Sequence, residues 1–123
     1  MNQILITNNP AARDAYEGRA EIIYLDNAGF MQVLHAARDK IHEGHKLLTH
    51  PLSGSVKPGQ TPYKSIMLSQ EQSALCVTSL TIIEDGIAIA KAQIERKKEP
   101  VWPDEVLEDF QMIDLSLISS GGA

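Results

Sequence analysis

Residues 3–25 read QILITNNPAARDAYEGRAEIIYL, and this stretch predicts the fold class. The apolar runs at 3–7 and 21–25 are rich in residue types that favour β-strands. Between them Asn9 is a good helix cap, Pro10 suits a first helical turn, and Gly18 suits the residue after a helix. A strand, a helix and a second strand in this order indicate an α/β domain with a largely parallel sheet.

The chain after residue 25 continues the alternation of strands and helices. Apolar residues between Phe30 and His42 recur at steps of three and four, which predicts an amphipathic helix. Short apolar runs at 46–49 and 63–69 predict a third and a fourth strand. The loop between these two runs is long enough for the fourth strand to run in either direction.

The C-terminal half is predominantly helical in pattern. A broad apolar stripe predicts a long helix over residues 70–98, in which Gly86 marks either close packing or a break into two helices. A further helix begins near Pro103, although the alternation over 113–117 also fits a final strand. We therefore expect one three-layer, Rossmann-like domain over residues 1–118, with a mostly parallel sheet of about four or five strands and helices on both faces. Residues 119–123 are expected to form a flexible tail.

Composition excludes several classes of function. The chain has 123 residues, a net charge of −5 and a pI near 5.3, which argue against a nucleic-acid partner. Its single cysteine, Cys76, excludes an internal disulfide framework and fits a reducing compartment. The first residues lack the pattern of a signal peptide, and no apolar run is free enough of charge to span a membrane. We expect a cytoplasmic domain that contacts no membrane.

Polar residues follow each of the first three predicted strands, where α/β proteins bind their ligands. If the strands are parallel, these residues lie on one rim of the sheet, to which the start of the fourth strand also returns. The predicted ligand-binding residues are Thr7, Asn8, Asn9, Asp26, His50, Ser53, Gly54, Ser55, Lys57, Tyr63 and Lys64. Asn8 and Asn9 also have a purely structural interpretation, as a turn residue and a helix cap.

The loop over residues 50–64 is the most distinctive part of this rim. Ser53, Gly54 and Ser55 offer hydroxyl and backbone N–H groups, and Lys57 adds a positive charge, so that the loop can cradle a phosphate or carboxylate. The alternative is a connection stiffened by prolines. The P-loop motif is absent, and we expect no cofactor.

The histidines at 42, 45 and 50 have a spacing that resembles a metal site. The predicted strand at 46–49 carries His45 and His50 to opposite ends, so that the three rings do not converge and we expect no metal. His50 alone is a candidate acid, base or hydrogen-bond donor.

Three segments resemble the GrdX family, whose members are encoded beside the glycine reductase genes of amino-acid-fermenting bacteria. They are Thr7-Asn8-Asn9-Pro10, the run HKLLTHPLSGSVKPGQTPYKS over residues 45–65, and LEDFQMIDLSL over 107–117. The resemblance implies a context in reductive amino-acid metabolism and transfers no catalytic residue.

Two functional hypotheses remain open. The first is an accessory protein of glycine or amino-acid reductase metabolism, which binds an anionic small ligand or a reductase subunit through the 50–64 loop. The alternative is a small enzyme acting on a phosphorylated or carboxylated metabolite, with His50 as acid or base and with Lys57 or Lys64 neutralising charge. A homodimer that packs through apolar C-terminal residues is compatible with either.

Overall fold

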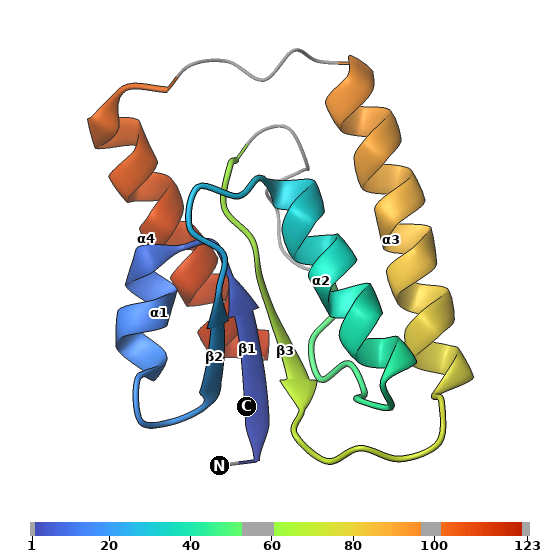
Figure 1. Ribbon diagram of the computed structural model, residues 1–123. Coiled ribbons are helices and arrows are strands. Elements are labelled where there is room, and N and C mark those ends of the chain that lie inside the picture. The colour runs from blue at the N-terminus through green and yellow to red at the C-terminus, as the bar shows by residue number, and fades with distance from the viewer. Residues whose placement is uncertain (1, 53–60, 97–101, 122–123) are drawn as a thin grey trace.

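A computed structural model of the chain describes residues 2–52, 61–96 and 102–121 (Figure 1). Its elements are β1 (Gln3–Thr7), α1 (Pro10–Tyr16), β2 (Glu21–Tyr24), α2 (Phe30–His42), β3 (Ser65–Ser69), α3 (Val77–Arg96) and α4 (Asp104–Gly121). The opening βαβ unit and the bounds of α2 agree with the sequence prediction. Asn9 caps α1, because its side-chain oxygen accepts a hydrogen bond from the Ala11 N–H.

The sheet described by the structure has three strands in the order β2-β1-β3. β1 pairs with β2 in parallel and with β3 in antiparallel orientation. Thr7, the last residue of β1, is opposite Tyr24 of β2 and opposite Ser65 of β3. The end of β1, the end of β2 and the start of β3 therefore lie at the same end of the sheet, as Figure 1 shows.

The expectation of a three-layer, Rossmann-like domain on a mostly parallel sheet of about four or five strands is wrong. The sheet in the described residues is small and mixed, because one of its two pairings is antiparallel. The predicted strand at 46–49 makes a single bridge, between Leu47 and Leu68. Residues 113–117, for which a strand was one alternative, lie inside α4.

Hydrogen bonds that involve side chains take the place of some of the backbone hydrogen bonds that a regular strand at 46–49 would make. The Leu47 N–H donates to the Ser79 hydroxyl of α3, and the Thr49 hydroxyl accepts from the Met67 N–H. The Leu48 N–H still donates to the Met67 carbonyl, and the Ser69 N–H donates to the Lys46 carbonyl, so this segment covers the outer edge of β3. A segment that satisfies its polar groups in this way needs no regular pairing.

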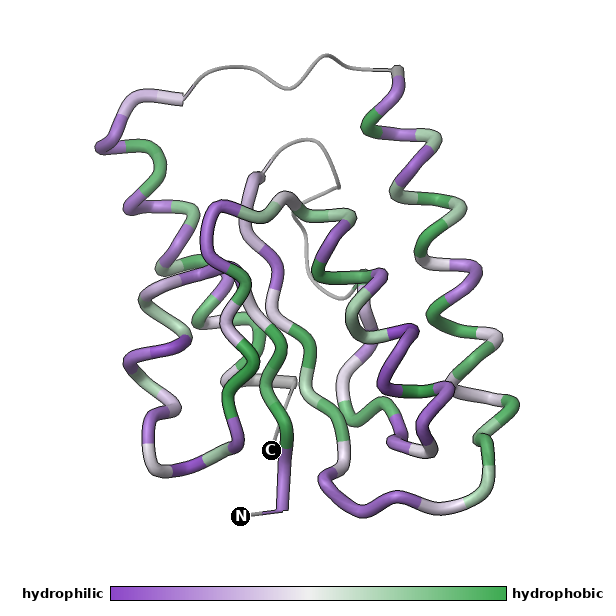
Figure 2. Tube along the Cα trace, viewed as in Figure 1, coloured by the Kyte–Doolittle hydropathy of each residue, from purple (hydrophilic) through white to green (hydrophobic). Residues whose placement is uncertain are grey.

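Helices pack on both faces of the sheet because apolar side chains alternate along the strands. Ile4 and Ile6 of β1 face a core with α2 and α3, whereas Leu5 faces a second core with α1 and α4. Figure 1 shows α3 lying outside α2, and Figure 2 shows the apolar residues concentrated along the strands and the inner helix faces. The two cores hold α2 and α4 firmly beside the rim.

Helix α3 is continuous through Gly86, so the prediction of close packing is confirmed and the break is not. A Cβ atom at Gly86 would lie 3.1 Å from Cγ of Pro51, which packs against the helix there. Helix α4 continues to Gly121, past residue 118 at which we placed the end of the domain. Within the described ranges, no helix is long and apolar enough to cross a membrane.

Candidate functional site

The rim of the sheet brings together residues that follow different strands. The Leu25 N–H donates to the Thr7 carbonyl, which continues the β1–β2 pairing to the rim. The Asn8 amide donates to the carbonyls of Ala28 and Pro62 and accepts from the Lys64 N–H. Asn8 therefore ties the loop after β2 to the segment that leads into β3. Asp26, Tyr63 and Asn8 line one shallow groove on this rim.

A closed hydrogen-bond network, which we call the Asn9–Asp114 cluster, lies beneath the rim and consists of Thr7, Asn9, Ser65 and Asp114. The Asn9 N–H donates to the Thr7 hydroxyl, which lies 2.7 Å from the Ser65 hydroxyl. The Ser65 hydroxyl donates to the Asp114 carboxylate at 2.6 Å, because a carboxylate oxygen accepts. The Asn9 amide donates to the same carboxylate oxygen and to the Gln111 carbonyl.

This cluster fastens α4 to the sheet. All four side chains are buried, and each makes hydrogen bonds within the protein. Buried polar groups that are satisfied in this way specify packing. The structure thus supports the structural interpretation of Asn8 and Asn9 and places Thr7 in the same role.

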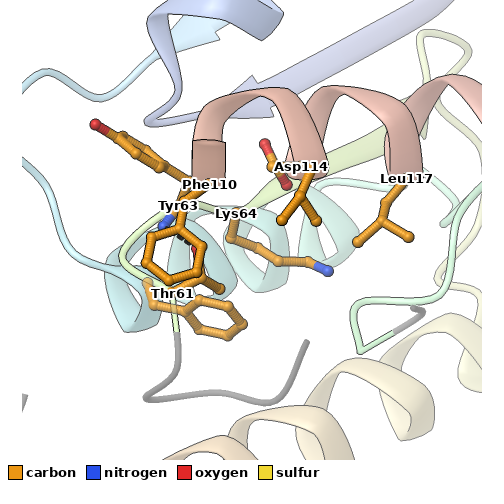
Figure 3. A pocket seen from close by; sticks show the side chains of 8 residues that line it. Thr61, Tyr63, Lys64, Phe110, Asp114 and Leu117 are labelled. Atoms are coloured by element: carbon orange, nitrogen blue, oxygen red, sulfur yellow. Dashed lines mark hydrogen bonds between the residues drawn. The ribbon is translucent and has the colours of Figure 1, made fainter. Parts of the chain in front are cut away.

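A second polar region, the Lys64 pocket, adjoins the cluster, and Figure 3 shows the side chains that line it. It is lined by Phe30, Thr61, Tyr63, Lys64, Phe110, Ile113, Asp114 and Leu117. Lys64 is only 7% exposed, and its Nζ lies 5.9 Å from the centre of the Phe30 ring. Its ammonium group makes no hydrogen bond or ion pair with any residue that the structure describes.

Burial lowers the pKa of Lys64, because the ammonium group loses hydration, and the negative charge of Asp114 opposes that shift in part. A buried cation next to apolar side chains is costly unless it finds an anionic or hydrogen-bonding partner. Within the described residues, Lys64 has the charge of Asp114 in the same pocket and makes no direct ion pair with it.

The polar groups of the neighbouring residues Tyr63 and Lys64 do not converge on one site. Figure 3 shows the Tyr63 hydroxyl and the Lys64 ammonium group pointing away from each other. The Tyr63 oxygen accepts a hydrogen bond of 2.9 Å from the Gln111 side chain, which holds the ring against α4. Tyr63 thus contributes its ring and backbone to the wall of the pocket, and Lys64 contributes the charge.

The structure does not bring His50 into the pocket. Its exposed ring accepts a hydrogen bond from the Leu52 N–H at 3.1 Å. The candidates Ser53, Gly54, Ser55 and Lys57 lie outside the described residues. His45 is buried and its Nδ1 donates to the Ser69 carbonyl, whereas His42 is exposed at the end of α2. Among the described residues, no group of three or more His, Cys, Asp or Glu side chains could hold a metal ion.

Sequence reasoning missed the contribution of α4 to the site. Asp114, Phe110 and Leu117 line the pocket, yet their segment was interpreted as a helix or strand without a polar role. A signal was present, because Asp114 stands four residues after Phe110, on the same face of the helix. A carboxylate on the inner face of a packed helix needs buried partners, and here Asn9 and Ser65 supply them.

Comparison with known proteins gives one family and no individual relative. No curated protein and no solved structure matches the chain significantly. The family model of the GrdX-like proteins matches residues 4–121, which include the seven helices and strands of the described residues except the first residue of β1. The match covers both the Asn9–Asp114 cluster and the Lys64 pocket. The chain therefore belongs to the GrdX-like protein family.

Proposed function

We propose that the chain is a non-catalytic accessory protein of glycine reductase metabolism that binds an anionic group at the Lys64 pocket. The family name supports the association with glycine reductase. One observation carries the binding role, which is that the Lys64 ammonium group is buried and makes no hydrogen bond or ion pair with any described residue. An anionic ligand, or an anionic group of a reductase subunit, would supply that partner.

Binding fits the pocket better than catalysis does. The titratable side chains that line it are Tyr63, Lys64 and Asp114. Asp114 already accepts hydrogen bonds from two side chains, and the Tyr63 hydroxyl is held by Gln111. General acid–base catalysis needs a group within hydrogen-bond reach of the reacting atom, and His50 does not line this pocket. The enzymatic alternative based on His50 gains no support from its exposed, locally bonded ring.

The test is a thermal-shift screen with phosphate, acetyl phosphate, acetate and glycine, followed by pull-down with purified glycine reductase subunits. A ligand that binds only the folded state raises the melting temperature by mass action. We expect at least one ligand or subunit to bind the natural chain and to lose binding in Lys64→Met, which keeps the length of the side chain without its charge. Lys91→Met removes an exposed lysine from α3 and is the matched control. Equal binding by both variants would refute the proposal.

A further inference from the structure

The two edges of the sheet are covered differently. The outer edge of β3 is covered by the segment at 46–49, which bonds to the backbone of Met67 and Ser69. β2 forms the opposite edge, where it has β1 on one side and, among the described residues, no strand on the other (Figure 1). An uncovered edge presents backbone N–H and C=O groups that can pair with a further strand.

The unpaired backbone groups of β2 are those of Ile22 and Tyr24. The Leu25 N–H donates to the Thr7 carbonyl, so the backbone groups of Leu25 point toward β1. Successive residues of a strand point these groups to opposite sides, so Tyr24 and Ile22 point theirs away from β1. Within the described ranges, neither residue makes a hydrogen bond on that side. Each therefore offers one donor and one acceptor at the spacing of an extended chain.

The side chains of β2 also suit an added strand. The strand reads EIIY, in which both isoleucines and the tyrosine are residue types that favour β-structure. It contains neither proline nor lysine, which commonly block further pairing at the edge of a sheet. Ile22 and Ile23 are only half-buried, so a strand placed beside them would remove more apolar surface from water.

An open groove of about 520 Å³ lies between the end of β2 and one flank of α2. Leu25 and Ala36 contribute apolar surface to this groove, and Asp26 and Asp39 contribute carboxylates. No lysine or arginine of the described residues lines it. Because side chains alternate between the two faces of a sheet, every second side chain of an added strand would point to the α2 side, toward the groove.

The charges decide between a second copy of the chain and a different partner. A second copy would bring a net charge of −5 against a net charge of −5, which opposes association. A segment that carries Lys or Arg would instead meet Asp26 and Asp39 with the opposite charge. The unpaired backbone groups thus select an extended chain, and the carboxylates select a basic side chain on it.

We propose that β2 binds an extended, basic segment of a protein partner, which adds a fourth strand to the sheet and places a Lys or Arg side chain in the groove beside Asp26 and Asp39. Backbone pairing would supply the affinity and the basic side chain the selectivity, as is usual in strand addition. This surface is separate from the Lys64 pocket, and the inference goes beyond the anion-binding role proposed above.

The probe is a library of random linear peptides displayed on mRNA and selected on the full-length chain. We expect the enriched peptides to be rich in β-forming residues and to carry Lys or Arg. In a synthetic enriched peptide, N-methylation of every second residue should weaken binding by about tenfold, because it removes a backbone donor that faces β2. Methylation of the residues between should weaken it by less than about twofold. Absence of enrichment, enrichment without basic residues, or methylation effects without this alternation would overturn the inference.

Amide hydrogen exchange locates the bound peptide on the chain. The N–H groups of Ile22 and Tyr24 should become at least about tenfold more protected in the complex, because the added strand supplies their acceptors. The Leu25 N–H is already bonded to Thr7 and is the internal control. Unchanged exchange at Ile22 and Tyr24 would place the peptide elsewhere and overturn the inference.

A pair of double variants tests the charge of the groove. Asp26→Asn with Asp39→Asn should weaken the peptide by about tenfold, the effect of losing two exposed ion pairs. Asp85→Asn with Asp109→Asn removes the same charge from exposed positions on α3 and α4 and should weaken it by less than about twofold. Equal losses would overturn the assignment of a basic side chain to the groove. Lys64→Met should bind the peptide as the natural chain does, so this inference and the proposed function can fail independently.

Discussion

Two polar regions lie side by side at one end of the sheet, and they use their buried charges in opposite ways. In the Asn9–Asp114 cluster, the charged residue is 6% exposed and accepts two side-chain hydrogen bonds. In the Lys64 pocket, the charged residue is 7% exposed and has no such partner among the described residues. Burial alone therefore does not distinguish scaffold from site. What distinguishes them is whether the buried charge has hydrogen-bond partners within the protein, because a buried charge without such partners gains most from a ligand.

The largest expected effect tests whether the Asn9–Asp114 cluster stabilises the fold. Asn9→Ala removes the helix cap and two hydrogen bonds to α4, and leaves the Asp114 carboxylate short of a donor. We expect the free energy of unfolding to fall by about 3 kcal/mol, as a lost cap and an unsatisfied buried acceptor each cost about 1–2 kcal/mol. Urea denaturation measures this change. Asn2→Ala, at an exposed position, is the control, and an equally small loss in both variants would show that the cluster is not a scaffold.

The second-largest expected effect is a gain in stability, and it concerns the Lys64 pocket. Lys64→Met keeps the apolar stem and removes a charge that is desolvated in the folded state. We expect the free energy of unfolding at neutral pH to rise by roughly 1 kcal/mol, the lower end of the cost of burying an unpaired polar group. Urea denaturation again provides the measurement, with Lys91→Met as the exposed control. A clear loss of stability would mean that Lys64 already has a strong partner within the chain.

The stability difference between Lys64→Met and the natural chain should depend on pH. Because burial lowers the pKa of Lys64 below its ordinary value of 10.5, the folded state releases the proton at lower pH than the unfolded state does. The cost of the buried charge is complete below the folded-state pKa and disappears as pH rises toward 10.5. We therefore expect the stability advantage of Lys64→Met over the natural chain to be constant near neutral pH and to narrow in alkaline solution. A gap that widens with pH would contradict the direction of the shift.

The smallest effect concerns a residue that belongs to neither region. His50 is exposed and bonded to its own loop, so we expect His50→Ala to change the free energy of unfolding by less than about 0.5 kcal/mol. It should also leave ligand binding at the Lys64 pocket unchanged, as measured by the same thermal-shift assay. A loss of binding as large as that of Lys64→Met would extend the site to His50.

The sequence predicted the parts of the site that depend on local order along the chain. Asn9 as a cap, the turn after β1 and the meeting of Asn8 with Lys64 at the rim follow from strand ends and capping chemistry. The sequence also predicted a strand from the apolar run at 46–49, which is wrong for the described structure. A local sequence pattern cannot indicate that the Leu47 N–H bonds to Ser79, which lies far along the chain, where a neighbouring strand would otherwise have supplied the acceptor.

By itself, the sequence determined the α/β class, the βαβ start and the bounds of α2, because these depend on periodicity and caps that act over a few residues. Only the tertiary structure decided the direction of β3, the place of α4 over the rim and the position of Lys64 and Asp114 in one pocket. Those features depend on contacts between residues far apart in the chain, such as Ser65 with Asp114. Whether a polar residue serves as scaffold or as site depends on such long-range partners, which local sequence patterns do not specify.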